Sequence, residues 1–222
     1  MSNIALVKKK YLYLIENFFS ANVIAGFTDP SFPGIIPEDL PLFLDFAGKS
    51  LRISYLKQSH SARVNLIGKK GVYKGDGIFT GERGLVLVVQ TADCLPLYFS
   101  RENDGVVGVV HMGWRSAKQE ILRNIPFDLS AFSALAGVGL RKCCYRVGRD
   151  FLNYKNLRQS LEKRESFYFD PIKFCQSFFV QQGLKKENFC DLAICSLCSK
   201  RGFFSYRRDQ TKKRMFSFIV KV

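Results

Sequence analysis

Apolar residues occur in short runs along most of the chain, and several of these runs predict β-strands. The continuous run Leu85–Val89 is followed by Gln90 and then by Thr91-Ala92-Asp93-Cys94. A buried strand that ends at a functional loop has this pattern. Leu95–Phe99 and Val106–Val110 predict two further strands, and Asn103-Asp104-Gly105 between them is typical of a hairpin turn.

The remaining pattern predicts a mixture of strands and helices. Asp170-Pro171 is a typical pair at the start of a helix, so we expect a helix over 171–183. Tyr11–Phe19 fits either a strand or a helix. Further helices are expected over 116–124 and 150–165, and further strands at Arg52–Leu56, Arg63–Ile67, Ala131–Val138, Phe189–Ile194, Phe203–Tyr206 and Met215–Val222. Without an internal repeat or an obvious linker, residues 1–222 are expected to form a single domain.

Composition favours a globular protein with reduced thiols. Of the 222 residues, 47% are hydrophobic and 14% aromatic, enough to bury a substantial core. The seven cysteines are odd in number and irregularly spaced, which argues against a disulfide framework and for a cytoplasmic protein. Neither a signal peptide nor an apolar segment of about 20 residues is evident, so no membrane association is expected.

The chain is strongly basic. It has 34 Lys and Arg residues against 19 Asp and Glu, a net charge of +15, and such a field attracts anions. The basic clusters are short and no nucleic-acid-binding motif accompanies them. A solvated basic surface is therefore favoured over a nucleic-acid partner.

The two histidines of the chain lie in segments that suggest chemistry. His60 and His111, with Cys94 between them in the sequence, could supply three metal ligands and leave a fourth position open. Cys94 and His111 are both expected near strand ends, on one rim of a sheet. Two alternatives stay open: core histidines with a buried free cysteine, and Cys94 as a nucleophile with His111 as its base.

Other polar motifs are less specific. Arg115 follows Gly113-Trp114, and Arg207-Arg208 follows an aromatic segment, so either could bind an anionic group. The alternatives are a surface arginine beside a core tryptophan, and a simple ion pair with Asp209. Cys195 and Cys198 form a C-x-x-C without a second such pair, and only one of the adjacent Cys143 and Cys144 is expected to face a given site. These thiols, with Cys175 and Cys190, are expected to be structural.

Taken together, the motifs resemble the YfiH-like family, also called the laccase-domain or multicopper polyphenol oxidoreductase family. Its pattern includes Gln-x-His, Thr-Ala-Asp-Cys-Leu-Pro, His-x-Gly-Trp-Arg, Cys-Tyr-x-Val-Gly and Phe-Phe-Ser-Tyr-Arg-Arg-Asp. All five are present in order between Gln58 and Asp209. The sequence departs from the pattern at Ser61 and Ser116, where glycine is usual, and in Ala136–Lys142, which lacks two usual prolines and gains two cations.

The resemblance implies an α/β fold of mixed sheets in α/β/β/α layers. It also implies zinc, with copper as a possible substitute, held by His60, Cys94 and His111. The implied activity is phosphorolysis of adenosine, inosine and methylthioadenosine, together with deamination of adenosine. For that chemistry, Asp93 is a candidate general acid or base, and Arg63, Arg115, Arg207 and Arg208 are candidate phosphate ligands.

The same residues are also compatible with other functions. A multicopper oxidase is disfavoured, because two histidines cannot ligate a mononuclear and a trinuclear copper centre. Amide hydrolysis that edits a peptidoglycan precursor could use the same metal-bound water or Cys94 as its nucleophile. An open three-ligand set argues against a non-catalytic binding module. A single copper ion at the same three ligands could give a weak oxidase activity. The expected partners are thus a small nucleoside and phosphate, in a monomer or homodimer.

Overall fold

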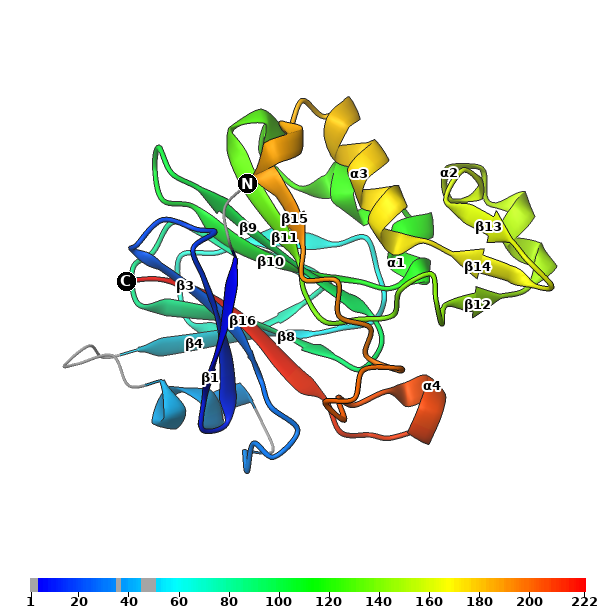
Figure 1. Cartoon of the computed structure of the whole chain (residues 1–222). Helices are drawn as coiled ribbons and strands as arrows, with labels where there is room; N and C mark the ends of the chain where they lie inside the picture. The colour runs from blue at the N-terminus through cyan, green and yellow to red at the C-terminus, as the bar shows by residue number, and fades with distance from the viewer. Residues whose placement is uncertain (1–3, 35–36, 45–50) are drawn as a thin grey trace.

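The computed structural model describes residues 4–34, 37–44 and 51–222, and two large β-sheets dominate it (Figure 1). The first sheet has seven strands. Their order is β1 (Ala5–Lys9), β2 (Leu12–Glu16), β3 (Val23–Thr28), β16 (Met215–Lys221), β8 (Leu85–Thr91), β4 (Arg52–Lys57) and β6 (Gly71–Lys74). The segment that fitted a strand or a helix at 11–19 is therefore the strand β2.

The second sheet has six strands, and a small third sheet has three. The six-stranded order is β15 (Phe189–Asp191), β11 (Phe132–Ala136), β9 (Leu95–Arg101), β10 (Val107–Met112), β7 (Gly77–Thr80) and β5 (Val64–Leu66). The small sheet consists of β12 (Arg146–Val147), β14 (Phe167–Phe169) and β13 (Leu161–Lys163). Most pairs are antiparallel, but β4–β8, β4–β6, β5–β7 and β11–β15 are parallel, so both large sheets are mixed.

Helices are short compared with the strands. The α-helices are α1 (Trp114–Lys118), α2 (Lys155–Arg158), α3 (Pro171–Gln181) and α4 (Tyr206–Asp209). Five 3-10 helices accompany them: η1 (Pro37–Phe43), η2 (Ile121–Asn124), η3 (Leu129–Ala131), η4 (Arg149–Asn153) and η5 (Lys186–Asn188). The α3 helix begins as predicted, because the Asp170 carboxylate accepts hydrogen bonds from the amides of Ile172 and Lys173.

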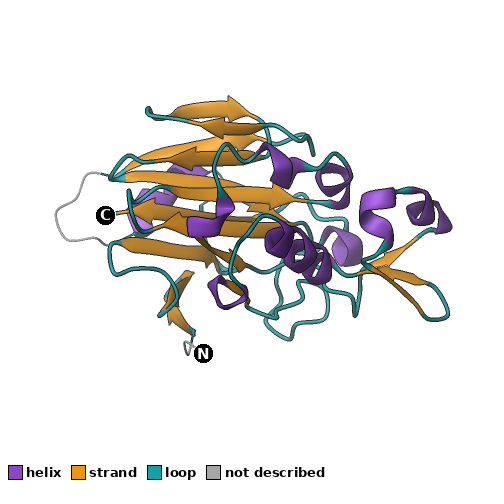
Figure 2. Ribbon diagram, turned by 90° about the horizontal axis from the view of Figure 1, so that it is seen from above, coloured by secondary structure: helices purple, strands orange, loops and turns teal. Residues whose placement is uncertain are grey.

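The sheets pack face to face, and their layers confirm the expected fold class (Figure 2). Leu87 and Ile219 of the seven-stranded sheet share one apolar cluster with Tyr98, Val109 and Leu135 of the six-stranded sheet. The opposite face of the six-stranded sheet packs against α1 and α3. On the outer face of the seven-stranded sheet, Leu40 of η1 is fully buried among strand residues.

Three predicted elements differ in the structure. The helix expected over 150–165 is replaced by η4, α2 and the strand β13, because Leu161–Lys163 pairs with β14. The small sheet and α2 project from the side of the two large sheets (Figures 1 and 2). The helix expected over 116–124 is interrupted at Glu120, whose φ of 60° is left-handed.

The third difference lies at the predicted strand Phe203–Tyr206. Ser205 caps α4 there by accepting a hydrogen bond from the Arg208 amide, so the chain turns into a helix instead of pairing with a sheet. Phe203 is nevertheless fully buried, in a cluster with Tyr13 and Phe27. The aromatic pattern therefore indicated burial correctly but not the backbone conformation.

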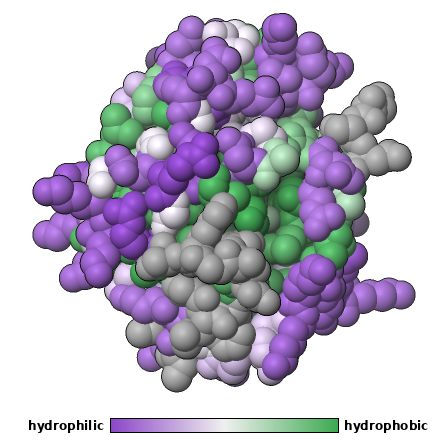
Figure 3. Space-filling view, turned by 90° about the vertical axis from the view of Figure 1, so that its left-hand side faces the viewer, coloured by the Kyte–Doolittle hydropathy of each residue, from purple (hydrophilic) through white to green (hydrophobic). Residues whose placement is uncertain are grey.

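The surface is consistent with the charge expected from the sequence. Hydrophilic side chains cover most of the described part of the face in Figure 3, and apolar side chains show between them. Among the described residues, the large apolar side chains that are well exposed are Leu66, Val72, Val180 and Tyr206. Nearly all lysines and arginines of the short basic clusters are exposed. The preference for a solvated basic surface over a nucleic-acid partner stays a prediction.

Candidate active site

Three connections between the two large sheets meet at one rim of the molecule. The chain crosses from the seven-stranded to the six-stranded sheet between β4 and β5, between β6 and β7, and between β8 and β9. His60 lies in the first crossing, Asp76 in the second and Cys94 in the third. His111 lies on β10 opposite Pro96 of β9, so its side chain reaches the same place.

The crossings contain unusual backbone conformations. His60 has a φ of 58° and Asp93 a φ of 87°, both in the left-handed region that non-glycine residues rarely adopt. Such conformations persist only where the surrounding structure holds them, and they concentrate at functional sites. Two of the three loops at this rim are therefore held in strained shapes.

His60, Cys94 and His111 converge as predicted. Their ligand atoms all lie within 4.8 Å of one another. Cys94 Sγ is 3.7 Å from His60 Nε2, and the two imidazole rings are 4.9 Å apart between centroids. Gly113 permits this approach, because a Cβ there would lie only 2.8 Å from Cys94 Sγ and 3.0 Å from His60 Cδ2.

Asp76 fixes the geometry around these three residues. Its Oδ1 accepts hydrogen bonds from the His60 amide at 3.0 Å and from His111 Nδ1 at 2.8 Å. Its Oδ2 accepts both the amide and the hydroxyl of Ser61, each at 2.7 Å. With Nδ1 directed to the carboxylate, His111 has Nε2 as its ligand atom, as metal-binding histidines usually do.

The electrostatics favour charged groups in this cluster. Burial would raise the pKa of Asp76, but hydrogen bonds from His111 and Ser61 lower it to about 2. Burial likewise opposes the Cys94 thiolate, yet the neighbouring His111 and His60 lower the pKa of this thiol. The pKa of His111 is raised, because Cys94 and Asp76 offset the cost of burial. Without a metal, a Cys94 thiolate beside a His111 imidazolium that is bound to the Asp76 carboxylate is therefore the favoured state.

The donor set fits a metal ion. One thiolate and two imidazoles are ligands that zinc and copper both accept, and three protein ligands leave one coordination position open. His60 and His111 come from separate segments, and a buried carboxylate orients the second one. Open three-ligand sites are typical of catalytic metals.

The cluster lies in a cavity of about 920 Å³, a volume typical of small-molecule sites. Polar and aromatic side chains line it together. The lining includes Tyr55, Gln58, Gln90, Trp114, Tyr145 and Tyr206 in addition to the three candidate metal ligands. Flat aromatic faces beside amide groups suit a planar, hydrogen-bonding ligand.

The four predicted phosphate-binding arginines divide into two groups. Arg115 and Arg207 line the cavity, and each guanidinium lies over an aromatic ring, of Trp114 and Tyr145 respectively. Arg208 lies outside the lining and is paired with Asp209 at 2.7 Å. Arg63 also lies outside it and donates to Asn65. The roles of Arg63 and Arg208 in substrate binding stay predictions.

Asp93 lines the cavity, but its carboxylate is already engaged. Oδ1 accepts a hydrogen bond from the Ser196 hydroxyl at 2.8 Å, and Oδ2 accepts one from the Arg207 amide at 2.7 Å. The first bond joins the β8–β9 crossing to the turn after β15, and the second joins it to the start of α4. Its role as a general acid or base stays a prediction.

Sequence reasoning did not assign roles to Asp76, Tyr145 or Arg214. Asp76 is fully buried, and its position between Gly75 and Gly77 was the available signal. Tyr145 belongs to the quoted Cys-Tyr motif and has a raised pKa because it is buried. Arg214 carries no motif, and only the fold brings it to the cavity.

Comparison with known proteins agrees with this geometry. Residues 41–221 match the family described as multi-copper polyphenol oxidoreductase laccase. The chain belongs to this family. A purine nucleoside phosphorylase of Aquifex aeolicus is 32% identical over 186 residues, covering 80% of this chain and 86% of that protein. A purine nucleoside phosphorylase of Clostridium acetobutylicum is 31% identical, covering 76% and 77%.

Solved structures show the same fold. The crystal structure of the Bacillus licheniformis hypothetical protein YfiH superposes with a TM-score of 0.83 at 21% identity and covers 99% of each chain. YlmD from Geobacillus stearothermophilus gives a TM-score of 0.79 at 22% identity. In the part of the chain that the structure describes, no helix is long and apolar enough to cross a bilayer.

Proposed function

We propose that this laccase-family protein is a zinc-dependent purine nucleoside phosphorylase acting on adenosine, inosine and methylthioadenosine, and that it deaminates adenosine at the same site. The observation that carries the proposal is the convergence of His60, Cys94 and His111 in a cavity with cationic and aromatic walls. The names of the relatives support the reaction type.

Phosphorolysis breaks the bond between the purine and C1′ of the ribose while a phosphate oxygen bonds to C1′. The products are the free purine and ribose 1-phosphate. Arg115, Arg207 and Arg214 would bind the phosphate through charge-assisted hydrogen bonds, since all three line the cavity. Tyr145 and Trp114 would flank the purine.

His60, Cys94 and His111 would hold the metal. Bound zinc supplies a Lewis acid that polarises a substrate oxygen or lowers the pKa of a water molecule. Asp76 would hold the proton on His111 Nδ1 throughout, because its carboxylate is buried and fully hydrogen-bonded. The Gln58 side chain bonds the backbone of Gln90 twice: its Nε2 donates to the carbonyl at 2.8 Å, and its Oε1 accepts from the amide at 2.7 Å. This pair would keep the rim of the cavity fixed.

Product analysis tests the proposal directly. Zinc-loaded protein is given adenosine with and without phosphate, and the products are identified by mass spectrometry. Adenine and ribose 1-phosphate that form only with phosphate are expected, and inosine would report deamination. His111→Ala should abolish both, whereas Asp104→Asn, an exposed carboxylate on the β9–β10 turn, should not.

A folded, zinc-loaded protein that forms none of these products would contradict the proposal. Amide hydrolysis of a peptidoglycan precursor by the same residues is the alternative that such a protein should next be tested for. A copper-dependent oxidase would instead consume oxygen when it is given a phenol. That activity is disfavoured, because two histidines are too few to ligate a multicopper centre.

A further inference from the structure

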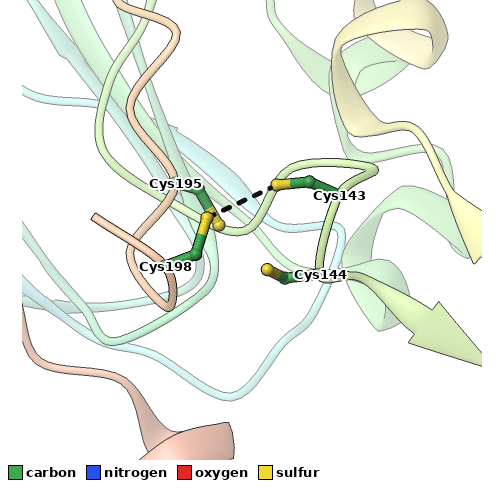
Figure 4. Close-up of side chains that lie close together, drawn as sticks. All are labelled: Cys143, Cys144, Cys195 and Cys198. Atoms are coloured by element: carbon green, nitrogen blue, oxygen red, sulfur yellow. Dashed lines mark hydrogen bonds between the residues drawn. The ribbon is translucent and has the colours of Figure 1, made fainter. Parts of the chain in front are cut away.

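Four cysteines form a second cluster, outside the cavity. Cys143 and Cys144 lie in a turn before β12, and Cys195 and Cys198 lie in a turn after β15 (Figure 4). Their four Sγ atoms all lie within 4.8 Å of one another. All four are free thiols, and both adjacent cysteines take part, where the sequence predicted only one.

The spacing of the sulfurs matches a tetrahedral metal site. Zinc binds thiolate sulfur at about 2.3 Å, so the corners of a regular ZnS4 tetrahedron are about 3.8 Å apart. Cys143 Sγ lies 3.7 Å from Cys198 Sγ, close to this edge length (Figure 4). Two protonated thiols can also form a hydrogen bond at this distance. Four converging sulfurs give each thiol three close partners, whereas a disulfide would need only one.

The four thiols differ in their access to solvent. Cys195 is buried and Cys144 is partly buried, whereas Cys143 and Cys198 are exposed. The cluster therefore lies at the surface, where a metal ion can reach it.

Protein contacts hold the two turns together. The Ser196 amide donates to the Gly139 carbonyl at 3.0 Å, and the Gly139 amide donates to the Ile194 carbonyl at 3.3 Å. Arg141 pairs with Asp191 at 2.6 Å. The four sulfurs are therefore brought to one place by the fold, and ordering them costs little further entropy.

We propose that Cys143, Cys144, Cys195 and Cys198 bind a zinc ion in a closed tetrathiolate site. Soft thiolates in a tetrahedral arrangement select zinc, and four protein ligands leave no open position for a substrate. The site is structural. Zinc binding releases the thiol protons and involves no change of oxidation state.

Its position indicates what the zinc stabilises. The Cys144 carbonyl accepts a hydrogen bond from Arg207, and the Leu197 carbonyl accepts one from Arg208. The Ser196 hydroxyl donates to Asp93. The two cysteine turns thus support one wall of the cavity from behind, and zinc would fix their separation.

Metal analysis tests the site independently of the enzyme activity. The His60→Ala/His111→Ala protein, purified under reducing conditions, should retain about one zinc per chain. Adding Cys144→Ser and Cys198→Ser to that protein should remove it, while adding the matched control Cys190→Ser should not. Cys190 lies on β15, outside the four-sulfur cluster.

Cobalt gives a second readout that keeps the native cysteines. Co²⁺ added to the metal-free His60→Ala/His111→Ala protein should produce thiolate-to-cobalt charge-transfer bands and the strong visible bands of a tetrahedral ion. The proposal is overturned if this protein holds iron or no metal, if it gives no such bands, or if a Cys143–Cys198 disulfide forms instead. If the serine variants fail to fold, the cobalt measurement on the protein with native cysteines decides the proposal. Neither measurement depends on phosphorylase activity, so the two proposals can fail separately.

Discussion

At the scale of single residues, Asp76 connects two of the candidate metal ligands. Its two oxygens accept bonds from the His60 loop and from His111, so one carboxylate positions two of the three candidate ligands. The cysteine and histidine motifs predicted the ligands. The residue that orients them was missed, because an aspartate between two glycines is equally typical of an ordinary turn.

Asp76→Asn tests this role. The asparagine NH2 would replace one carboxylate oxygen and would face the N–H and O–H donors of His60, Ser61 and His111. Zinc affinity at the cavity should therefore fall about 10–100-fold. Unfolding free energy should also fall by about 1–3 kcal/mol for the unsatisfied group. Chelator competition and chemical denaturation measure the two effects. Asp104→Asn is the matched control, and equal affinity in the two variants would rule out the role.

Gly113→Ala tests the close approach of the ligands. A methyl group there would lie 2.8 Å from Cys94 Sγ, while the φ of −93° suits alanine. We expect loss of metal at the cavity in a protein that still folds, measured by metal content and circular dichroism. Gly68→Ala, where a Cβ meets nothing within 4 Å, should retain the metal. Normal metal content in Gly113→Ala would show that the site can expand.

At the scale of elements, strands were predicted better than helices. Runs such as Leu85–Val89 are buried on both faces, and continuous apolar sequence indicates that directly. The segment 150–165 has the composition of a helix but forms η4, α2 and β13, and β13 pairs with β14 through tertiary structure. The pairing of strands brings all three crossings and β10 to one rim, and local sequence does not specify that pairing.

The packing between the sheets should dominate stability. Leu87 of β8 is fully buried between them, so Leu87→Ala should lower the unfolding free energy by about 2–5 kcal/mol. Leu66→Ala on β5 removes the same atoms from a side chain that is 57% exposed, and it should change stability by about 0.5 kcal/mol or less. Urea denaturation compares them. Similar losses of unfolding free energy in the two variants would show that packing between the sheets does not dominate stability.

At the scale of the whole molecule, the charge of +15 should affect the anionic substrate more than the neutral one. If the chain is a phosphorylase, the KM for phosphate should rise several-fold as potassium chloride increases from about 0.02 M to about 0.3 M, because salt shortens the screening length. The KM for inosine should change little. Steady-state kinetics measure both, and an equal response would mean that the field does not reach the cavity.

The position of β16 has a consequence for how the protein is made. This strand lies between β3 and β8, and its Phe216 amide donates to the Thr28 hydroxyl, 188 residues away. During translation, both neighbours leave the ribosome long before the strand that joins them. Until it arrives, β3 and β8 each present an unpaired edge to other nascent chains, so aggregation competes with folding in that interval. Chaperone dependence during synthesis should therefore exceed what the stability of the finished protein suggests.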